Sequence, residues 1–163
     1  MTQQQKKLFE FFDALGIMHQ TYHHNPLFTC DDVCTVEVPA PHTKNLFLKD
    51  DQKRLWLISA LQSTKIDLKA LAKKLDAKGL RFAQPDLLRE YLGVEPGSVT
   101  WFALINDEQK VVHPLLDQRL FDSKVTCFHP LSNDATTVIA SNDLMTFAEA
   151  LGREYQIIDF QNL

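Results

Sequence analysis

Residues 44–60 read KNLFLKDDQKRLWLISA, and this stretch decides the fold class. Two runs rich in large apolar residues, 44–49 and 54–60, flank a polar turn over residues 49–53. Short apolar runs that are bounded by polar turn residues are typical of strands. The sequence therefore predicts a β-hairpin at this point of the chain.

Helix and strand signals alternate on both sides of this hairpin. Residues 4–15 and 67–78 carry apolar side chains at helical spacing, and Gly16 and Gly79 fit the stops of the two helices. Further strands are expected over 17–23, 99–105, 110–113, 125–128, 136–140 and 155–160, and further helices near 29–32, over 85–92 and over 143–151. This mixture predicts a single α/β or α+β domain over residues 1–163.

The composition is ordinary for a globular protein. The 163 residues, 45% of them hydrophobic and 23% charged, are enough to bury a core without disulfides or a metal. The start, MTQQQKKLFEFF, lacks a signal-peptide pattern. No apolar run approaches the ~20 residues that a membrane-spanning helix needs. We therefore expect a cytoplasmic protein that has no membrane partner.

The charge is unevenly distributed along the chain. The formal net charge is −4, which by itself argues against binding to nucleic acid. Residues 44–81, however, hold ten basic and only four acidic residues. Such asymmetry can create a positive surface on an acidic protein. This segment is either a nucleic-acid-binding surface or a solvated helix face that has no partner.

The three cysteines do not indicate a disulfide framework. Cys30, Cys34 and Cys127 are an odd number in a chain that is expected to be cytoplasmic. Cys30 and Cys34 have helical spacing, and His23 and His24 are nearby, but this spacing matches no common zinc module. We therefore expect reduced thiols, no metal and no other cofactor.

No standard catalytic motif is present, but three local features can carry chemistry. Lys44 follows a double-proline segment, and the compact charge of a lysine suits a phosphate. The loop 93–101 contains glycines, so its backbone N–H groups can point at an oxyanion or a phosphate. His129, at a strand end, can orient a substrate or shuttle a proton. The plain alternatives are a surface lysine, an ordinary turn and a packed histidine.

A set of short motifs extends along nearly the whole chain, from about Leu8 to Phe160. The motifs are His24-Asn25-Pro26-Leu27-Phe28-Thr29, the run from His42 to Asp50, Leu80-Arg81-Phe82-Ala83, Leu92-Gly93, residues 96–100, residues 102–107, Phe128-His129-Pro130, Asn133 and Thr136-Thr137. In order and spacing they resemble the YbaK/prolyl-tRNA synthetase-associated domain family. Within it, the chain is most similar to the freestanding Ala-tRNA(Pro) deacylases of the ProX and PrdX type.

This resemblance implies both a fold and an activity. The implied fold is a curved, barrel-like mixed β-sheet that is packed with helices. The implied activity is trans-editing, in which the enzyme hydrolyses the ester between a wrong amino acid and the 3′ adenosine of a tRNA. The implied partners are the 3′ acceptor end of proline tRNA and, in addition, prolyl-tRNA synthetase. No cofactor is implied.

The resemblance also assigns the site. The family's critical lysine falls on Lys44, its histidine on His129, and its Gly-x-x-x-Pro loop on residues 97–101. The expected catalytic residues are Lys44, Gly97, Ser98 and His129, and the expected substrate-binding residues are Asn45, Val99, Thr100 and Trp101. Trp101 stands where the family's loop usually has proline, which leaves the geometry of the loop and the size of the pocket open.

The expected mechanism needs no covalent nucleophile, because an aminoacyl ester is already activated. Lys44 would bind the terminal phosphate or ribose, and backbone N–H groups around 97–100 would hold the carbonyl oxygen or the attacking water. The vicinal ribose hydroxyl can assist proton transfer, and His129 would shape the pocket. Three alternatives stay open: a deacylase for Cys-tRNA(Pro) or another small residue, a noncatalytic tRNA-binding module, and a small-molecule hydrolase that uses Cys30 or Cys127.

Overall fold

The computed structural model describes residues 1–29 and 32–163. Its α-helices are α1 (Gln3–Ala14), α2 (Leu68–Leu75), α3 (Pro85–Leu87) and α4 (Asp143–Ala150). Its strands are β1 (His19–His23), β2 (Thr43–Lys49), β3 (Leu55–Leu61), β4 (Arg81–Phe82), β5 (Val112–Asp117), β6 (Val125–Phe128), β7 (Ala135–Ala140) and β8 (Gln156–Ile158). A π-helical turn, η1 (Leu88–Leu92), and three 3₁₀ helices, η2 (Trp101–Asn106), η3 (Gln118–Asp122) and η4 (Phe160–Asn162), complete the fold.

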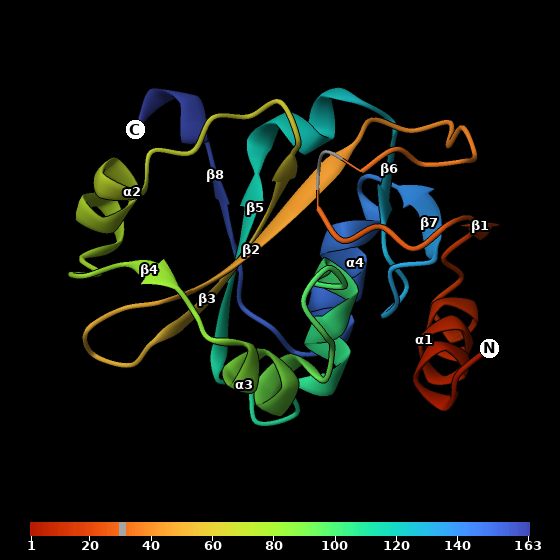
Figure 1. Cartoon of the computed structure of the whole chain (residues 1–163), viewed down its shortest axis with the longest axis horizontal. Coiled ribbons are helices and arrows are strands. Elements are labelled where there is room, and N and C mark those ends of the chain that lie inside the picture. The colour runs from red at the N-terminus through yellow and green to blue at the C-terminus, as the bar shows by residue number, and fades with distance from the viewer. Residues whose placement is uncertain (30–31) are drawn as a thin grey trace.

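The strands form two sheets, and helices pack against them (Figure 1). The larger sheet has the order β4-β2-β3-β5-β8, in which β2 is antiparallel to β3 and β4, while β3, β5 and β8 are parallel. The smaller sheet, β1-β7-β6, is antiparallel. The predicted mixed α/β architecture is confirmed. The described strands leave both sheets open, so the expected barrel-like closure is not seen.

The predicted hairpin is present, and its turn is held by a buried carboxylate. Strands β2 and β3 pair from Thr43 opposite Leu61 to Lys49 opposite Leu55. At the turn, the Asp50 carboxylate accepts hydrogen bonds from the main chain and the side chain of Arg54. Burial opposes the charge on this carboxylate, but these hydrogen bonds outweigh it and lower the pKa of Asp50.

Successive side chains along the strands of the larger sheet point to opposite faces, so the core is divided into two parts. Leu48 and Ile58 face α2, whose Leu71 is fully buried against them. On the other face, Phe47 and Leu57 belong to the larger core, which also contains residues of α1, η2 and α4. Figure 1 shows α4 between the two sheets. Period-two side chains on a sheet that is covered on both faces explain the nearly continuous apolar sequence of β3.

The expected strand over 99–105 is wrong, because this segment contains the 3₁₀ helix η2. All side chains from Trp101 to Ile105 are buried. A short apolar run cannot distinguish a buried strand from a buried helix by periodicity alone. The local signal for the helix is Thr100, whose hydroxyl oxygen accepts a hydrogen bond from the N–H of Phe102 and caps the first turn.

The other expected elements lie close to the observed ones, with shifts at their ends. The strand expected over 110–113 begins at Val112 and extends to Asp117. The helix expected over 85–92 is divided between α3 and η1. The helix expected near 29–32 falls on residues 30 and 31, which lie outside the described residues. Within the described ranges, no helix is long and apolar enough to cross a membrane.

Candidate active site

A cavity of about 720 Å³ lies where the two sheets meet. Residues from β2, β6, β7, the loop at Gly97 and a segment that we call the strap, residues 27–29 and 32–38, line it. The Thr43 hydroxyl donates a hydrogen bond of 2.6 Å to the carbonyl of Cys127 and thereby joins β2 of one sheet to β6 of the other. Figure 1 shows the strap, in orange, near β2 and β6.

The structure brings five of the eight expected site residues together at this cavity. Lys44, Asn45, Gly97, Val99 and His129 line it. The other three, Ser98, Thr100 and Trp101, are buried and do not line it. The cavity therefore joins segments that are about 30 to 85 residues apart in the sequence.

Lys44 is held by a chain of hydrogen bonds. Its ammonium donates to the main-chain carbonyl of Thr64, on the turn that follows β3. The buried Thr64 hydroxyl donates in turn to the carboxylate of Asp117, at 2.5 Å, and Asp117 is fully buried. An ammonium has three N–H donors, so the bond to Thr64 fixes its position and leaves donors for a substrate oxygen.

The side chain of Asn45 is oriented in a similar way. The hydroxyl of Ser59, on the neighbouring strand β3, donates a hydrogen bond of 2.5 Å to the amide oxygen of Asn45. Because Ser59 is fully buried, this bond fixes which side of the amide faces the protein. The NH₂ group of Asn45 is then the part of the side chain that can donate to a ligand in the cavity.

Gly97 occupies a position that strongly favours glycine. Its φ is +90°, and a Cβ atom there would lie 3.3 Å from the carbonyl oxygen of Leu27 and 3.4 Å from Cα of Phe28. The Gly97 loop therefore packs directly against the backbone of the strap. The next N–H along, that of Ser98, donates to the carbonyl of Glu95 at 2.9 Å and closes the turn.

His129 lies in the cavity beside a second histidine. Its Nδ1 donates to the carbonyl oxygen of Ala135 at 2.7 Å, which makes Nε2 the unprotonated nitrogen of the neutral ring. Burial lowers the pKa of His129, and the neighbouring His24 adds to this effect, although the bond to Ala135 opposes it. The imidazole is therefore neutral at pH 7.

His24 and Thr136 are site residues that the sequence alone did not identify. The two imidazole rings, of His24 and His129, have their centroids 6.0 Å apart. Nδ1 of His24 donates to the carbonyl of Asn25, and its Nε2 is 2.8 Å from the hydroxyl of Thr136, which lines the cavity. The available signal was their place in the family motifs, but only the pairing of β1 with β7 brings them together.

Trp101 belongs to the core and not to the cavity. Its side chain is fully buried, its Nε1 donates to the carbonyl of Leu144 at 3.1 Å, and its ring contacts Tyr155 edge to face. The ring therefore connects η2 to α4. With Trp101 in this position, Gly97 packs against the strap.

The thiol of Cys127, which lines the cavity, is a poor candidate for a nucleophile. Burial raises the pKa of Cys127 to about 12, and Cys34 reinforces the effect. The thiol of Cys127 donates to the carbonyl of Pro41 at 3.3 Å, as expected for a protonated group. Cys30 lies outside the described residues. Among residues 1–29 and 32–163, no group of three His, Cys, Asp or Glu side chains is placed to hold a metal ion.

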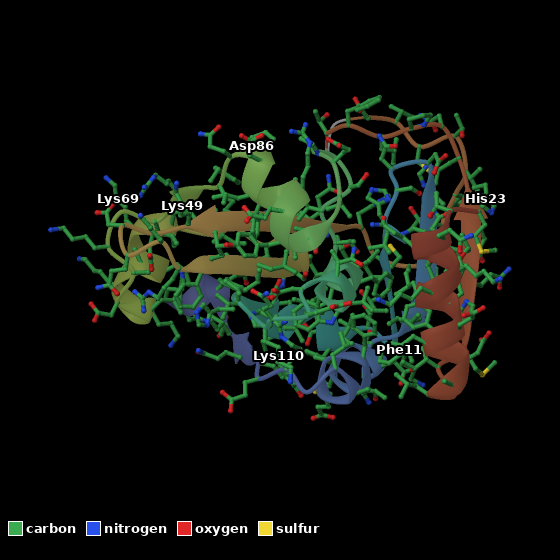
Figure 2. All side chains as sticks on the ribbon, turned by 90° about the horizontal axis from the view of Figure 1, so that it is seen from below. Phe11, His23, Lys49, Lys69, Asp86 and Lys110 are labelled. Carbon is green, nitrogen blue, oxygen red and sulfur yellow. The ribbon has the colours of Figure 1, made fainter. Side chains whose placement is uncertain are left out.

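The basic segment of the sequence gathers around α2 and the β2–β3 turn. Lys69, Lys73 and Lys74 are exposed on α2, and Lys53 is exposed at the turn. Figure 2 shows Lys49 and Lys69 at one end of the molecule and His23 at the other. Strand β2 therefore runs from the cavity, at Lys44, toward this basic end.

Comparison with known proteins places the chain in a family. Residues 24–147 match the family described as the aminoacyl-tRNA editing domain. The chain is 33% identical to the prolyl-tRNA editing protein ProX of Acetoanaerobium sticklandii over 150 residues, which cover 90% of this chain and 92% of that protein. It is 35% identical to the prolyl-tRNA synthetase associated domain-containing protein 1 of Danio rerio over 165 residues, which cover 95% of this chain and 86% of that protein.

A solved structure has the same fold. It was assigned provisionally as a trans-editing enzyme for prolyl tRNA synthetase. The superposition covers 96% of this chain and 97% of that chain, with a TM-score of 0.70 and 14% sequence identity. Fold, cavity and sequence thus define a tRNA-editing protein, and the chain belongs to the aminoacyl-tRNA editing domain family. Editing removes the amino acid from a charged tRNA, so the chain is an aminoacyl-tRNA deacylase.

Proposed function

We propose that this deacylase removes alanine from mischarged proline tRNA. The observation that carries the proposal is the placement of Lys44, Gly97 and His129 around one cavity, in a chain whose relatives are named for prolyl-tRNA editing. The ester substrate supplies its own activation. The site therefore needs to bind the 3′ end of the tRNA, position water and exclude the correct amino acid.

Alanine is the substrate that physical reasoning favours. A synthetase site that is shaped for proline cannot strongly reject a smaller amino acid, because one methylene in a hydrophobic pocket is worth only about 1–3 kcal/mol. A second site that admits alanine and excludes proline by size corrects the error. Cysteine, whose side chain is also small, is the alternative substrate at the same site.

The reaction is a hydrolysis in which one bond forms and one breaks. The oxygen of water attacks the ester carbonyl carbon, and the bond from that carbon to the ribose oxygen then breaks. The ribose oxygen takes a proton and becomes the free hydroxyl of the tRNA, while alanine leaves as its carboxylate. The vicinal ribose hydroxyl is placed to relay the proton, so the mechanism needs no covalent nucleophile and is consistent with the raised pKa of Cys127.

Each lining residue has a role in this proposal. Lys44, held by Thr64, binds the terminal phosphate or ribose, and Asn45 donates to the substrate beside it. The main chain of Gly97 and Val99 stabilises the oxyanion or holds the water. His129 shapes the pocket, because a lowered pKa makes its neutral ring a weak base.

The basic end of the molecule gives the rest of the tRNA a place to bind. Strand β2 covers five residue steps from Lys44 to Lys49, or ~17 Å at about 3.4 Å per residue. An acceptor arm with its 3′ end in the cavity can follow β2 toward the lysines of α2. Docking on prolyl-tRNA synthetase is a further part of this proposal, and it is tested by binding to the purified synthetase.

Deacylation of a panel of charged tRNAs tests the proposal. The panel contains Ala-tRNA(Pro), Cys-tRNA(Pro), Pro-tRNA(Pro) and Ala-tRNA(Ala). Loss of alanine from proline tRNA alone is the expected result. If cysteine is removed from proline tRNA faster than alanine, Cys-tRNA(Pro) replaces Ala-tRNA(Pro) as the proposed substrate. If the folded protein hydrolyses none of the four and only binds tRNA, the chain is a noncatalytic binding module.

A further inference from the structure

Two exposed apolar side chains lie on the strap at the cavity. Of the large apolar side chains that are exposed in the described part of the chain, only Phe28 and Val33 line the cavity. Their exposed fractions are 67% and 82%. Isolated exposed apolar residues need no explanation, but two of them on one wall of a substrate cavity point to a ligand.

The backbone that carries the Phe28 ring is held firmly. The N–H groups of Phe28 and Thr29 donate to the carboxylate of Asp32 at 2.6 and 3.1 Å. These two backbone bonds are the main reason that the pKa of Asp32 is lowered. On its other side, Leu27 donates to the carbonyl of Asn133 at 2.9 Å. The aromatic ring is therefore exposed although its main chain is fixed.

The same segment packs against the Gly97 loop. A Cβ atom at Gly97 would have the carbonyl oxygen of Leu27 and Cα of Phe28 as its nearest neighbours. Farther along, the side chain of Asn25 accepts from the N–H of Thr35 at 2.7 Å and donates to the carbonyl of Val33 at 2.9 Å. The Cα atom that carries the Phe28 ring thus lies beside the loop at which we place the ester carbonyl.

The charge of the strap selects the kind of group that binds it. Residues 27–38 contain no lysine or arginine, and Asp32 and Glu37 are exposed. Carboxylates repel a phosphate, whereas Lys44, which lines the same cavity from β2, attracts one. A nucleotide in the cavity therefore turns its phosphate toward Lys44 and its uncharged base toward the strap.

We propose that Phe28 is the stacking platform for the terminal adenine base of the tRNA. This inference rests on the proposed function, because it places the nucleoside whose ribose carries the amino acid. A purine presents a flat π-face, and stacking of a base on an aromatic side chain is a common way to hold single-stranded ends. The wall of the strap that includes Val33 covers the edge of the base.

Binding of an uncharged RNA tests the platform independently of catalysis. The probe is an acceptor-stem hairpin of proline tRNA in which 2-aminopurine replaces the terminal adenine, since stacking changes its fluorescence. The wild-type protein should quench the fluorescence, Phe28→Tyr should retain the quenching, and Phe28→Leu should lose it. Met18→Ala is the matched control, because Met18 is 86% exposed and does not line the cavity.

Deacylation kinetics provide the second readout. Loss of stacking should raise the KM of Phe28→Leu for the charged tRNA by about 5- to 100-fold, which corresponds to the usual strength of one stacked base. The preference among amino acids should not change. A changed preference would show that Phe28 contacts the amino acid instead, and the proposal would be wrong.

Two further outcomes would overturn the platform and leave the proposed function intact. One is unchanged quenching and KM in Phe28→Leu. The other is a wild-type dimer that Phe28→Leu converts to monomer without RNA, since the ring would then belong to an interface between copies. If instead the wild-type protein quenches the probe but hydrolyses no charged tRNA, the proposed function fails and the platform stands.

Discussion

The ammonium of Lys44 donates a hydrogen bond to the main-chain carbonyl of Thr64, so the position of this lysine depends on a turn of the neighbouring strand. That turn is held in place by the buried carboxylate of Asp117, which accepts from the hydroxyl of Thr64 and from the N–H of Leu61. A residue that does not line the cavity therefore fixes the position of one that does.

This relationship predicts coupled effects of two substitutions. Lys44→Ala should lower kcat/KM for Ala-tRNA(Pro) by about 10- to 100-fold, the value of a charged hydrogen bond. Asp117→Asn should also lower it, because an amide cannot accept from all of the donors that surround the carboxylate. In the Lys44→Ala background, Asp117→Asn should have no further effect on kcat/KM. Additive losses would show that Asp117 does not act through Lys44.

The contact between Gly97 and the strap predicts that a side chain at position 97 lowers the unfolding free energy by more than backbone strain alone would. Gly97→Ala should lower the unfolding free energy by about 1–3 kcal/mol and reduce deacylation, because the new Cβ meets the backbone of Leu27 and Phe28. Gly16→Ala is the control, since Gly16 also has a positive φ but has no atom within 4 Å of its would-be Cβ. Urea unfolding should show a larger loss for Gly97→Ala, and equal losses would contradict the packing argument.

The lowered pKa of His129 predicts a pH dependence of stability. The folded protein resists protonation of this ring, whereas the unfolded chain takes the proton near the ordinary value of 6.5. The unfolded state then binds more protons, so stability falls as the pH drops from 6.5 through the folded pKa. In urea unfolding between about pH 5 and pH 7.5, the unfolding free energy of His129→Gln should fall less with decreasing pH than that of the wild-type protein. His113, whose pKa burial also lowers, accounts for part of the remaining slope.

The place of Trp101 in the core predicts an effect on stability and not on specificity. Trp101→Phe removes the bond to the carbonyl of Leu144, at a cost of about 1–3 kcal/mol of unfolding free energy. The ranking of the four charged tRNAs should not change. Trp101→Pro, which introduces the residue that the resemblance led us to expect in this loop, should destabilise the protein more, because it removes the buried ring. A change of amino-acid preference in Trp101→Phe would show that Trp101 does affect the substrate site.

The lysines of α2 predict a salt-dependent contribution to tRNA binding. Replacement of Lys69, Lys73 and Lys74 by alanine should weaken binding and reduce the slope of log Kd against log salt by roughly one for each phosphate that is no longer neutralised. Lys7→Ala, on α1, is the control for the removal of an exposed charge. Equal slopes of log Kd against log salt for the triple variant and the control would show that α2 is not part of the binding surface.

The sequence predicts the elements of this fold better than the way they meet. The hairpin of β2 and β3 follows from local patterns, because two apolar runs flank one polar turn. Trp101 shows the limit of this approach, since its apolar surroundings suit a strand and a buried 3₁₀ helix equally well. A barrel-like closure was expected from the family alone, whereas the described strands form two open sheets.

The candidate site divides in a similar way. Lys44, Gly97 and His129 were expected because their residue types carry chemistry and fall on family motifs. His24 and Thr136 were missed because their contact depends on the pairing of β1 with β7. Phe28 appears in a family motif, but its exposure at the cavity is a property of the folded strap that no local pattern contains.

The pairing of β1 with β7 also determines when the enzyme can first work. The hydroxyls of Thr21 and Thr137, 2.8 Å apart in the folded protein, are 116 residues apart along the chain. Contacts of such long range form late, because the entropy cost of closing the loop comes before the contact stabilises anything. The wall of the cavity that contains Thr136 therefore forms only after residues 1–140 have left the ribosome.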